Sequence, residues 1–409
     1  MSLTFIEAVK TAVERTVALN RKETVLLNRA AGRILATDII AQKNLPSFDN
    51  SAMDGFAFKA DDAGKRLRIR RTIYAGDTAA PDLHAGECYR IMTGAQVPSD
   101  ADTVAPVETC RDITDTHVTL PEDISPGSNF RRKGEEVRRG DVLLQRGHIL
   151  RYGDIALLSA QGILGVEVFA KPSVAVISTG DEIKEPWQNA SDDEIYNANA
   201  FGIKAMLEHF GFTPRYVGAL PDNKEAVTRF IGSLKGYDVI LTTGGISKGD
   251  HDFLYDAFKT NGFKEWFHGV NLKPGKGVTF GTMGNTVIMA MPGNPLATML
   301  TTHALAIPAL YKLAGAEACH HTFTYAEFAH DLRFKPGRTD LVLGKMENGV
   351  FIPTRNNRIG SGMLTPLSES TAVAYIGEGY GTVEREDLIK VVLLNDTTRS
   401  ATFHALNER

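Results

Sequence analysis

The sequence predicts a multidomain protein of the α/β plus β class: a central, mostly parallel sheet, a small β-rich inserted domain and a C-terminal β domain. Between residues 171 and 316, apolar strand-like runs alternate with helix-periodic segments, which is typical of a parallel sheet covered by helices. Short alternating runs bounded by glycine and proline occur on both sides of this region. The 409 residues also exceed what one ordinary domain needs.

Composition excludes several classes of protein. Hydrophobic residues make up 43% and charged residues 23%, as in soluble globular proteins. The 45 basic and 49 acidic residues give a net charge of -4, so we expect no global attraction for nucleic acid or for an anionic membrane. The three cysteines are far apart, which argues against a zinc cage or a disulfide framework and favours a reducing cytoplasm. Charged residues interrupt the N-terminal segment, where a signal peptide would need a continuous apolar run. No apolar stretch of the sequence is long enough to cross a membrane.

The first helix is predicted from a capping box. Thr4 is followed three residues later by Glu7, and Phe5, Val9 and Val13 fall on one helical face together with Ile6. A second helix is expected over residues 26–35. After Leu45 the apolar residues no longer follow a helical spacing, and residues 66–140 are expected to form short strands.

The central region predicts alternating strands and helices. We expect strands over 173–179, 215–220, 238–245, 278–283 and 286–291, with helices over 201–210, 227–234, 252–259 and 295–314 between and after them. The apolar runs VAVI and VILT are typical of strands that helices cover on both faces. Beyond Gly315, the Asn348-Gly349 turn predicts a hairpin, and two further strands are expected over 371–378 and 387–394.

Polar loops follow the central strands, at the edge where open parallel sheets bind ligands. Their glycines would let backbone amides approach an anion such as phosphate. Glu182, Asp222, Asp250 and Asp252 beside such an anion suggest a hard cation such as Mg²⁺. Lys273 and Lys276 add two positive charges on a rigid turn. Ordinary β-α turns and helix caps would give similar loops, so this structural alternative stays open.

One motif suggests a different enzyme class. Residues 245–249, GISKG, match the G-x-S-x-G nucleophile elbow and would make Ser247 the nucleophile of a serine hydrolase. A downstream histidine would be required, and His303, His320 and His321 are the candidates in the right order. The short pattern is weak support for this alternative.

Seven strings together resemble one family. PSFDNSAMDGFAF, RIMTGA, FRRKGEE, STGDEI, TTGGISKGDHDF, KPGKG and MPGNP occur in the order and spacing of the molybdopterin molybdotransferase family, which includes MoeA and the gephyrin E domain. The resemblance spans nearly the whole chain and implies a four-domain, elongated subunit. The implied domains are 1–45 with 141–170 (helical and mixed, discontinuous), 46–140 (small, β-rich, inserted), 171–316 (α/β, molybdopterin-binding) and 317–409 (C-terminal, β).

The resemblance implies an enzyme that takes adenylylated molybdopterin and molybdate, releases AMP with the help of Mg²⁺, and yields molybdenum cofactor. The implied catalytic residues are Asp54, Thr93, Glu182, Asp222 and Asp252, of which Glu182, Asp222 and Asp252 would hold Mg²⁺. A homodimer is also implied, with its site between the α/β domain of one subunit and the small β domain of the other. A non-catalytic scaffold, as in the gephyrin relatives, is a second alternative.

The residues implied to bind the substrates are the lysines, the hydroxyls and the glycine-rich loops. Molybdate is a tetrahedral dianion, and its pocket would comprise Lys273, Lys276, Arg338 and Ser361. The loop residues expected to bind are Gly244, Gly245, Ser247, Pro292, Gly293, Asn294 and Pro295. The chain departs from the family pattern at Ala297, where serine is common, and at Glu136, where aspartate is common. Thr298 or backbone amides would then compensate for the missing serine, and tungstate stays open as the physiological ion.

Overall fold

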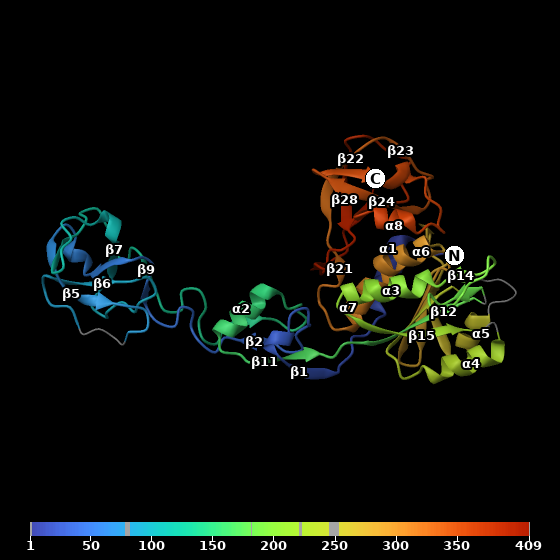
Figure 1. The fold of residues 1–409 in the computed structure, drawn as a ribbon, viewed down its shortest axis with the longest axis horizontal. Helices are drawn as coiled ribbons and strands as arrows, with labels where there is room; N and C mark the ends of the chain where they lie inside the picture. The colour runs from blue at the N-terminus through green and yellow to red at the C-terminus, as the bar shows by residue number, and fades with distance from the viewer. Residues whose placement is uncertain (1, 78–81, 181, 221–222, 245–252, 409) are drawn as a thin grey trace. The chain divides into compact units, whose positions relative to one another are not determined.

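The computed structural model of the protein describes residues 2–77, 82–180, 182–220, 223–244 and 253–408. The chain divides into two compact units, each with a core of its own (Figure 1). Unit 1 comprises Met1–Thr37, Arg146–Ile155 and Gly165–Arg409, and unit 2 comprises Asp38–Gln145 and Ala156–Leu164. Among the described residues, no helix has both the length and the apolar character that crossing a membrane requires.

The first helix, α1 (Phe5–Glu14), begins at the predicted capping box. The Thr4 side chain accepts a hydrogen bond from the Glu7 backbone N–H at 3.3 Å, and the Glu7 carboxylate accepts one from the Thr4 N–H at 2.8 Å. Phe5, Val9 and Val13 are buried, as their spacing predicts. This part of the prediction is confirmed.

The helix expected over residues 26–35 is wrong. Strand β1 (Lys22–Leu26) pairs antiparallel with β11 (Gly165–Phe169), and a single 3₁₀ turn, Leu27–Arg29, follows it. Two causes act against a helix here: Leu26, Ile34 and Leu35 pair with Gly165, Ile149 and Val168, far later in the chain, and Gly32 has a φ of 76°. Neither cause is visible in the local apolar spacing.

The central sheet of unit 1 has six strands in the order β15-β12-β16-β20-β19-β17. Pairs among β15, β12, β16 and β20 are parallel, which confirms the predicted α/β core, whereas β19 is antiparallel to both of its neighbours. The edge strand β17 is not among the predicted strands. The bounds are β12 Ser173–Thr179, β15 Thr213–Leu220, β16 Val239–Thr243, β17 Phe263–His268, β19 Thr279–Met283 and β20 Thr286–Met291.

Alternate residues of the central strands enter two different cores. Val174, Val176 and Leu241 pack with α1, α3 (Ala198–His209), α6 (Pro295–Thr301) and α7 (Ile307–Leu313). Ala175, Ile177 and Ile240 pack with α4 (Lys224–Ser233) and α5 (Phe253–Thr260). The strands are therefore buried on both faces, which explains their uninterrupted apolar sequence.

A second sheet of unit 1 has seven strands in the order β18-β24-β25-β22-β28-β26-β30. The predicted hairpin is present, because β24 and β25 pair across Asn348 and Gly349, whose φ values are 49° and 84°. The short strand β18, from the central region, joins this sheet beside β24. The bounds are β18 Leu272–Lys273, β22 Thr324–Phe328, β24 Thr339–Glu347, β25 Val350–Pro353, β26 Ala372–Ile376, β28 Leu388–Leu393 and β30 Leu406–Asn407.

Unit 2 contains a five-stranded sheet in the order β7-β4-β6-β5-β8. Its strands are β4 Gly55–Phe58, β5 Arg66–Ile73, β6 Glu87–Ile91, β7 Thr103–Pro106 and β8 His117–Thr119. This agrees with the short strands expected over 66–140. The remaining helices and strands of the described chain are α2 Tyr152–Ala160, α8 Thr365–Glu369, β2 Ile39–Ile40, β3 Asn50–Ser51, β9 Phe130–Arg131, β10 Val142–Leu144, β13 Ile183–Lys184, β14 Ile195–Tyr196, β21 His320–His321, β23 Leu332–Arg333, β27 Thr382–Val383 and β29 Arg399–Ser400.

Two histidines stack inside the core of unit 1. His303 lies in a π-helical turn, Thr302–Ala306, that joins α6 to α7 within the single helix predicted over 295–314. Its ring stacks on that of His321 with centroids 4.1 Å apart. Arg399 lies 2.9 Å from Nδ1 of His321 and is itself 9% exposed. Burial lowers the pKa of His303 to about 3 and that of His321 well below its usual value.

The stability of the protein is therefore expected to fall with decreasing pH. The unfolded chain binds protons at both histidines near pH 6.5 and the folded chain does not, so stability is complete above about pH 6.5 and is lost below it. The expected loss is about 1.4 kcal/mol per pH unit for each histidine between pH 6 and 5. Urea unfolding of the wild type and His303→Phe from pH 7.5 to 5 measures it. A variant whose stability falls with the same pH slope as the wild type would contradict this account.

Candidate functional site

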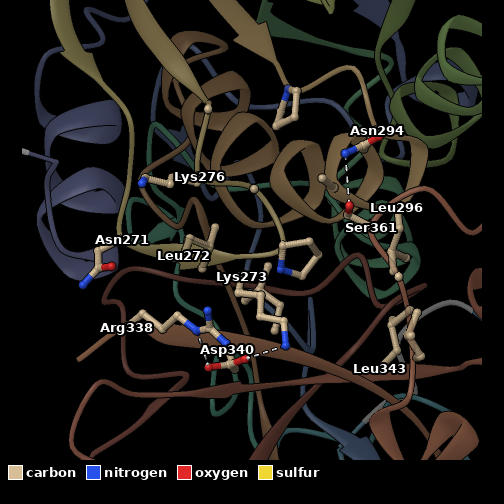
Figure 2. Close-up of a pocket in the computed structure, with 18 of the residues that line it drawn as sticks. Asn271, Leu272, Lys273, Lys276, Asn294, Leu296, Arg338, Asp340, Leu343 and Ser361 are labelled. Atoms are coloured by element: carbon tan, nitrogen blue, oxygen red, sulfur yellow. Dashed lines mark hydrogen bonds and ion pairs between the residues drawn. The ribbon is translucent and has the colours of Figure 1, made fainter. Parts of the chain in front are cut away.

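A cavity of about 600 Å³ lies in unit 1 between the loop that follows β20 and the seven-stranded sheet (Figure 2). Its lining includes all four residues expected to form the molybdate pocket and part of the loop expected to bind beside them. They come from three segments far apart in the sequence: Lys273 and Lys276 from one turn, Pro292 and Asn294 from the loop after β20, and Arg338 and Ser361 from the C-terminal part of the chain. Gly293 belongs to the same loop as Asn294, and Pro295 is the first residue of α6.

The lining of the cavity is strongly cationic. Lys273, Lys276 and Arg338 contribute three positive charges, and Asp340 contributes one negative charge, which leaves a formal charge of +2. Figure 2 shows Arg338 and Lys273 directed toward the Asp340 carboxylate; the nitrogen-oxygen distances are 3.4 Å and 3.9 Å. Burial raises the pKa of Asp340, and the two cations oppose that shift. The sequence analysis did not identify Asp340 as a site residue.

Hydrogen bonds hold the loop after β20 against the C-terminal part of the chain. Asn294 Nδ2 donates to Ser361 Oγ at 3.0 Å, and the Leu296 N–H donates to the Ser361 carbonyl at 3.0 Å. The N–H of Leu296, in the first turn of α6, is thus used within the protein. This amide is therefore not available to an anion in the cavity.

The carboxyl ends of β12, β16 and β20 meet beside the cavity. Gly244, after β16, has a φ of 82°, and a Cβ atom there would lie 3.1 Å from Thr179 Oγ1 and 3.7 Å from the Gly293 Cα. Its N–H donates to the Met291 carbonyl at 3.1 Å. Glycine at this position therefore permits the close approach of the loops, which is the role expected of such loops at the carboxyl edge of a parallel sheet.

Asn199 is a further residue of this region that sequence reasoning missed. Its Nδ2 donates to the Gly293 carbonyl at 2.7 Å and so ties the start of α3 to the loop after β20. Asn199 is 9% exposed. The only signal in the sequence was an asparagine beside the helix cap Asn197, which is an ordinary capping pattern.

The predicted Mg²⁺ ligands are described only in part. Glu182 is exposed, and its carboxylate lies against Gly180, where a Cβ atom would come within 2.6 Å of Oε2. A carboxylate is the type of oxygen donor that Mg²⁺ takes. Asp222 and Asp252, together with the predicted Gly245 and Ser247, lie outside the described residues. Among the residues that the structure describes, no group of three or more metal-ligating side chains forms a metal site.

Two predicted catalytic residues contact each other in unit 2. Asp54 Oδ1 accepts hydrogen bonds from the backbone N–H and the hydroxyl of Thr93, both at 2.7 Å. These bonds lower the pKa of Asp54, so the carboxylate is ionised at neutral pH. The structure thus brings together Asp54 of the AMDG string and Thr93 of the MTGA string, which are 39 positions apart in the sequence.

The two departures from the family pattern differ in their position. Ala297 lines the cavity, so a methyl group faces the space where the family commonly has a serine hydroxyl. Thr298 does not compensate: it is fully buried, and its hydroxyl bonds to the carbonyls of Pro292 and Asn294. The side chain points back into its own helix and loop, and compensation by backbone amides stays a prediction. Glu136 is exposed in unit 2, and its N–H donates to the Leu45 carbonyl.

The histidines that a serine hydrolase would need are buried. His303 and His321 are 1% and 3% exposed, stack on each other, and lie beside Arg399. His320 is 8% exposed. A general base must reach the substrate, so these positions do not favour the hydrolase alternative.

Two family models match the chain. The MoeA N-terminal region (domain I and II) matches residues 3–162, and a probable molybdopterin binding domain matches residues 175–312. Together they cover most of the chain, in the order in which the seven strings occur. The predicted resemblance is therefore confirmed by models that describe whole domains.

Relatives and a solved structure agree. A molybdopterin molybdenumtransferase of Haemophilus influenzae is 35% identical over 316 residues, which is 76% of this chain and 78% of its own length. Another, of Staphylococcus epidermidis, is 30% identical over 399 residues, 95% of this chain and 94% of its own length. The crystal structure of the molybdopterin biosynthesis moeA protein of Pyrococcus horikoshii OT3 matches with a TM-score of 0.84 and 28% identity, over 96% of this chain and 100% of that chain, which confirms the predicted fold class. The chain thus belongs to the molybdopterin molybdenumtransferase family.

Proposed function

We propose that the protein inserts molybdate into adenylylated molybdopterin, with Mg²⁺-dependent release of AMP, and so forms molybdenum cofactor. The observation that carries this proposal is the cavity whose lining has a formal charge of +2. Molybdate is a tetrahedral dianion of equal and opposite charge. The names of the relatives, molybdopterin molybdenumtransferases, point to the same chemistry.

The cavity supplies the interactions that a tetrahedral dianion requires. Lys273 and Lys276 act as point charges, and Arg338 adds a planar fork of N–H donors that suits two oxygens of one anion. Ser361 accepts from Asn294, which leaves its own proton for a further acceptor. Tungstate has the same charge and shape as molybdate, so these side chains would bind both ions.

The remaining predicted residues would act on the adenylylated pterin. Asp54 is held ionised by Thr93 and would orient a positively polarised group or a water molecule. Glu182 would hold Mg²⁺ with Asp222 and Asp252, and the ion, when bound, would balance negative charge on the pyrophosphate. Gly244 and Gly293, at the ends of central strands, would let backbone approach the substrate closely, and Gly245, the next residue in the sequence after Gly244, is proposed to act with them. No described feature favours a non-catalytic scaffold.

The transfer activity is tested with Lys276→Ala. Loss of one cation from the cavity weakens the pocket for molybdate, and we expect kcat/KM for molybdate to fall on the order of 100-fold. The assay measures AMP release from adenylylated molybdopterin and reconstitution of an apo-molybdoenzyme. Lys235→Ala, an exposed lysine outside the cavity, is the control and should behave as the wild type. The proposal fails if the wild type neither releases AMP nor reconstitutes the molybdoenzyme with molybdate or tungstate.

The role of Glu182 is tested with Glu182→Gln. Replacing a carboxylate ligand by a neutral amide weakens binding of Mg²⁺, so the Mg²⁺ concentration for half-maximal AMP release should rise about tenfold or more. The KM for molybdate should stay unchanged. Glu208→Gln, an exposed carboxylate paired with Lys204 on α3, is the matched control. AMP release that persists in the wild type after chelation of divalent cations would exclude this role.

A homodimer is part of the proposal. Several large apolar side chains are exposed on unit 1, among them Tyr152 at 90%, Val17 at 79% and Leu26 at 63%. The second subunit of a homodimer would cover side chains of this kind. Sedimentation of the wild type at micromolar concentration should give about twice the 44.6 kDa chain mass, and Tyr152→Glu should shift the protein toward the monomer. A monomeric wild type at all concentrations would rule the dimer out.

We also propose a cytoplasmic location. Cys88, Cys110 and Cys319 are free thiols, and Cys88 and Cys319 are buried. Burial raises the pKa of the thiols of Cys88 and Cys319, which makes them slow to oxidise. Fractionation of cells that express the chain would place it; recovery in an exported fraction would contradict the proposal.

A further inference from the structure

A buried carboxylate lies among the cations of the cavity. Asp340 is 4% exposed, and aspartate is rarely buried without close partners. Its contacts with the two nearest cations are long: Oδ2 lies 3.4 Å from Arg338 Nε, and Oδ1 lies 3.9 Å from Lys273 Nζ (Figure 2). An oxyanion in the same cavity would need the same two cations.

The backbone fixes the position of this carboxylate. Strands β18 and β24 are parallel, and their register places Lys273 directly beside Asp340. Arg338 precedes Asp340 by two residues, so both side chains project to the same face of the extended chain. On the other side of β24, β26 places the apolar Ile376 opposite Asp340. The strand register therefore fixes Asp340 beside the two cations.

A negative charge here weakens the binding of an anion. Without Asp340, the three cations would give the cavity a formal charge of +3; with it the charge is +2. Repulsion between two anions is strong in a site that is partly shielded from water. In the proposed function the oxyanion is a substrate that leaves the cavity in the product, and binding that is too tight would not speed its transfer.

We propose that Asp340 competes with the oxyanion for Arg338 and Lys273 and thereby sets how strongly the pocket holds a doubly charged anion. Asp340 is in this sense a specificity-determining residue of the pocket. The inference rests on the proposed function for the identity of that anion.

The test compares two anions of similar size and shape that differ in charge. Molybdate is a tetrahedral dianion, and perrhenate is a tetrahedral monoanion. Asp340→Asn keeps the shape of the side chain and an acceptor for Arg338 but removes the charge. By titration calorimetry we expect molybdate to bind about tenfold tighter to the variant and perrhenate about threefold tighter, since a Coulomb interaction scales with the charge of the ligand. Equal loss of affinity for both anions would mean that Asp340 is merely structural and would overturn the inference.

The pH dependence of perrhenate binding gives a second measurement, which needs no variant. Burial holds the pKa of Asp340 above its usual value, and the charged groups that face it are Arg338 and Lys273, with Lys276 in the same cavity. Lysine and arginine stay protonated from pH 8 down to 3.8, the ordinary pKa of an aspartate carboxyl, and perrhenate stays a monoanion throughout. Protonation of Asp340 removes the competing charge, so the affinity of the wild type should rise as the pH falls through this range, while that of Asp340→Asn stays flat. A wild-type affinity that does not rise would overturn the inference.

A matched control separates this effect from a general effect of losing a buried charge. Asp238 is 9% exposed and is bound by Arg21 at 2.5 Å and by Ser173, outside the cavity lining. Asp238→Asn should leave both affinities unchanged; a gain equal to that of Asp340→Asn would overturn the inference. If Asp340→Asn does not fold, as judged by near-UV circular dichroism, the pH profile of the wild type decides alone.

The two proposals fail in different ways. A wild type that binds molybdate and releases AMP, together with an Asp340→Asn variant that gains no affinity, would overturn the inference and leave the proposed function intact. A wild type that binds neither molybdate nor tungstate would overturn both.

Discussion

The parallel pairing of β18 with β24 is the constraint on which the cationic cavity depends. It aligns Lys273 with Asp340, and the turn that follows β18 carries Lys276 into the same cavity. A second link, from Asn294 to Ser361, holds the loop after β20 in place. Residues more than sixty positions apart thus form one wall, and the wall exists only when both sheets of unit 1 have formed. Stability and anion binding are therefore coupled in this chain.

Local patterns predicted much of the fold. The strand over 173–179 has the observed bounds of β12, and the capping box at Thr4 and the hairpin at Asn348 are present as expected. In each case neighbouring residues carry the information: an uninterrupted apolar run, a reciprocal pair of side chains, or a turn that needs positive φ. The same holds for the lysines of the cavity, which stand in a short, distinctive string.

Local patterns could not predict contacts between residues that are far apart in the sequence. Residues 26–35 have a helical apolar spacing, yet Leu26, Ile34 and Leu35 pair with residues that follow much later in the chain. Asp340 has no local signal at all, because its role arises from a register with β18. Asn199 looks like part of a helix cap, and its bond to Gly293 depends on how α3 packs beside the loop after β20. The sequence thus predicts which residues of the candidate site could bind the substrates. The residues that position them, such as Asn199, are found only from the structure.

The central claim, that the cavity of unit 1 binds a tetrahedral dianion, has a direct measurement. Crystals of the protein soaked with tungstate would locate the ion by the anomalous scattering of tungsten. The account predicts one strong peak within hydrogen-bonding distance of Lys273, Lys276 and Arg338, with the ion's oxygens also near Ser361. A peak elsewhere in the molecule, with this cavity free of tungsten at saturating tungstate, would contradict the account.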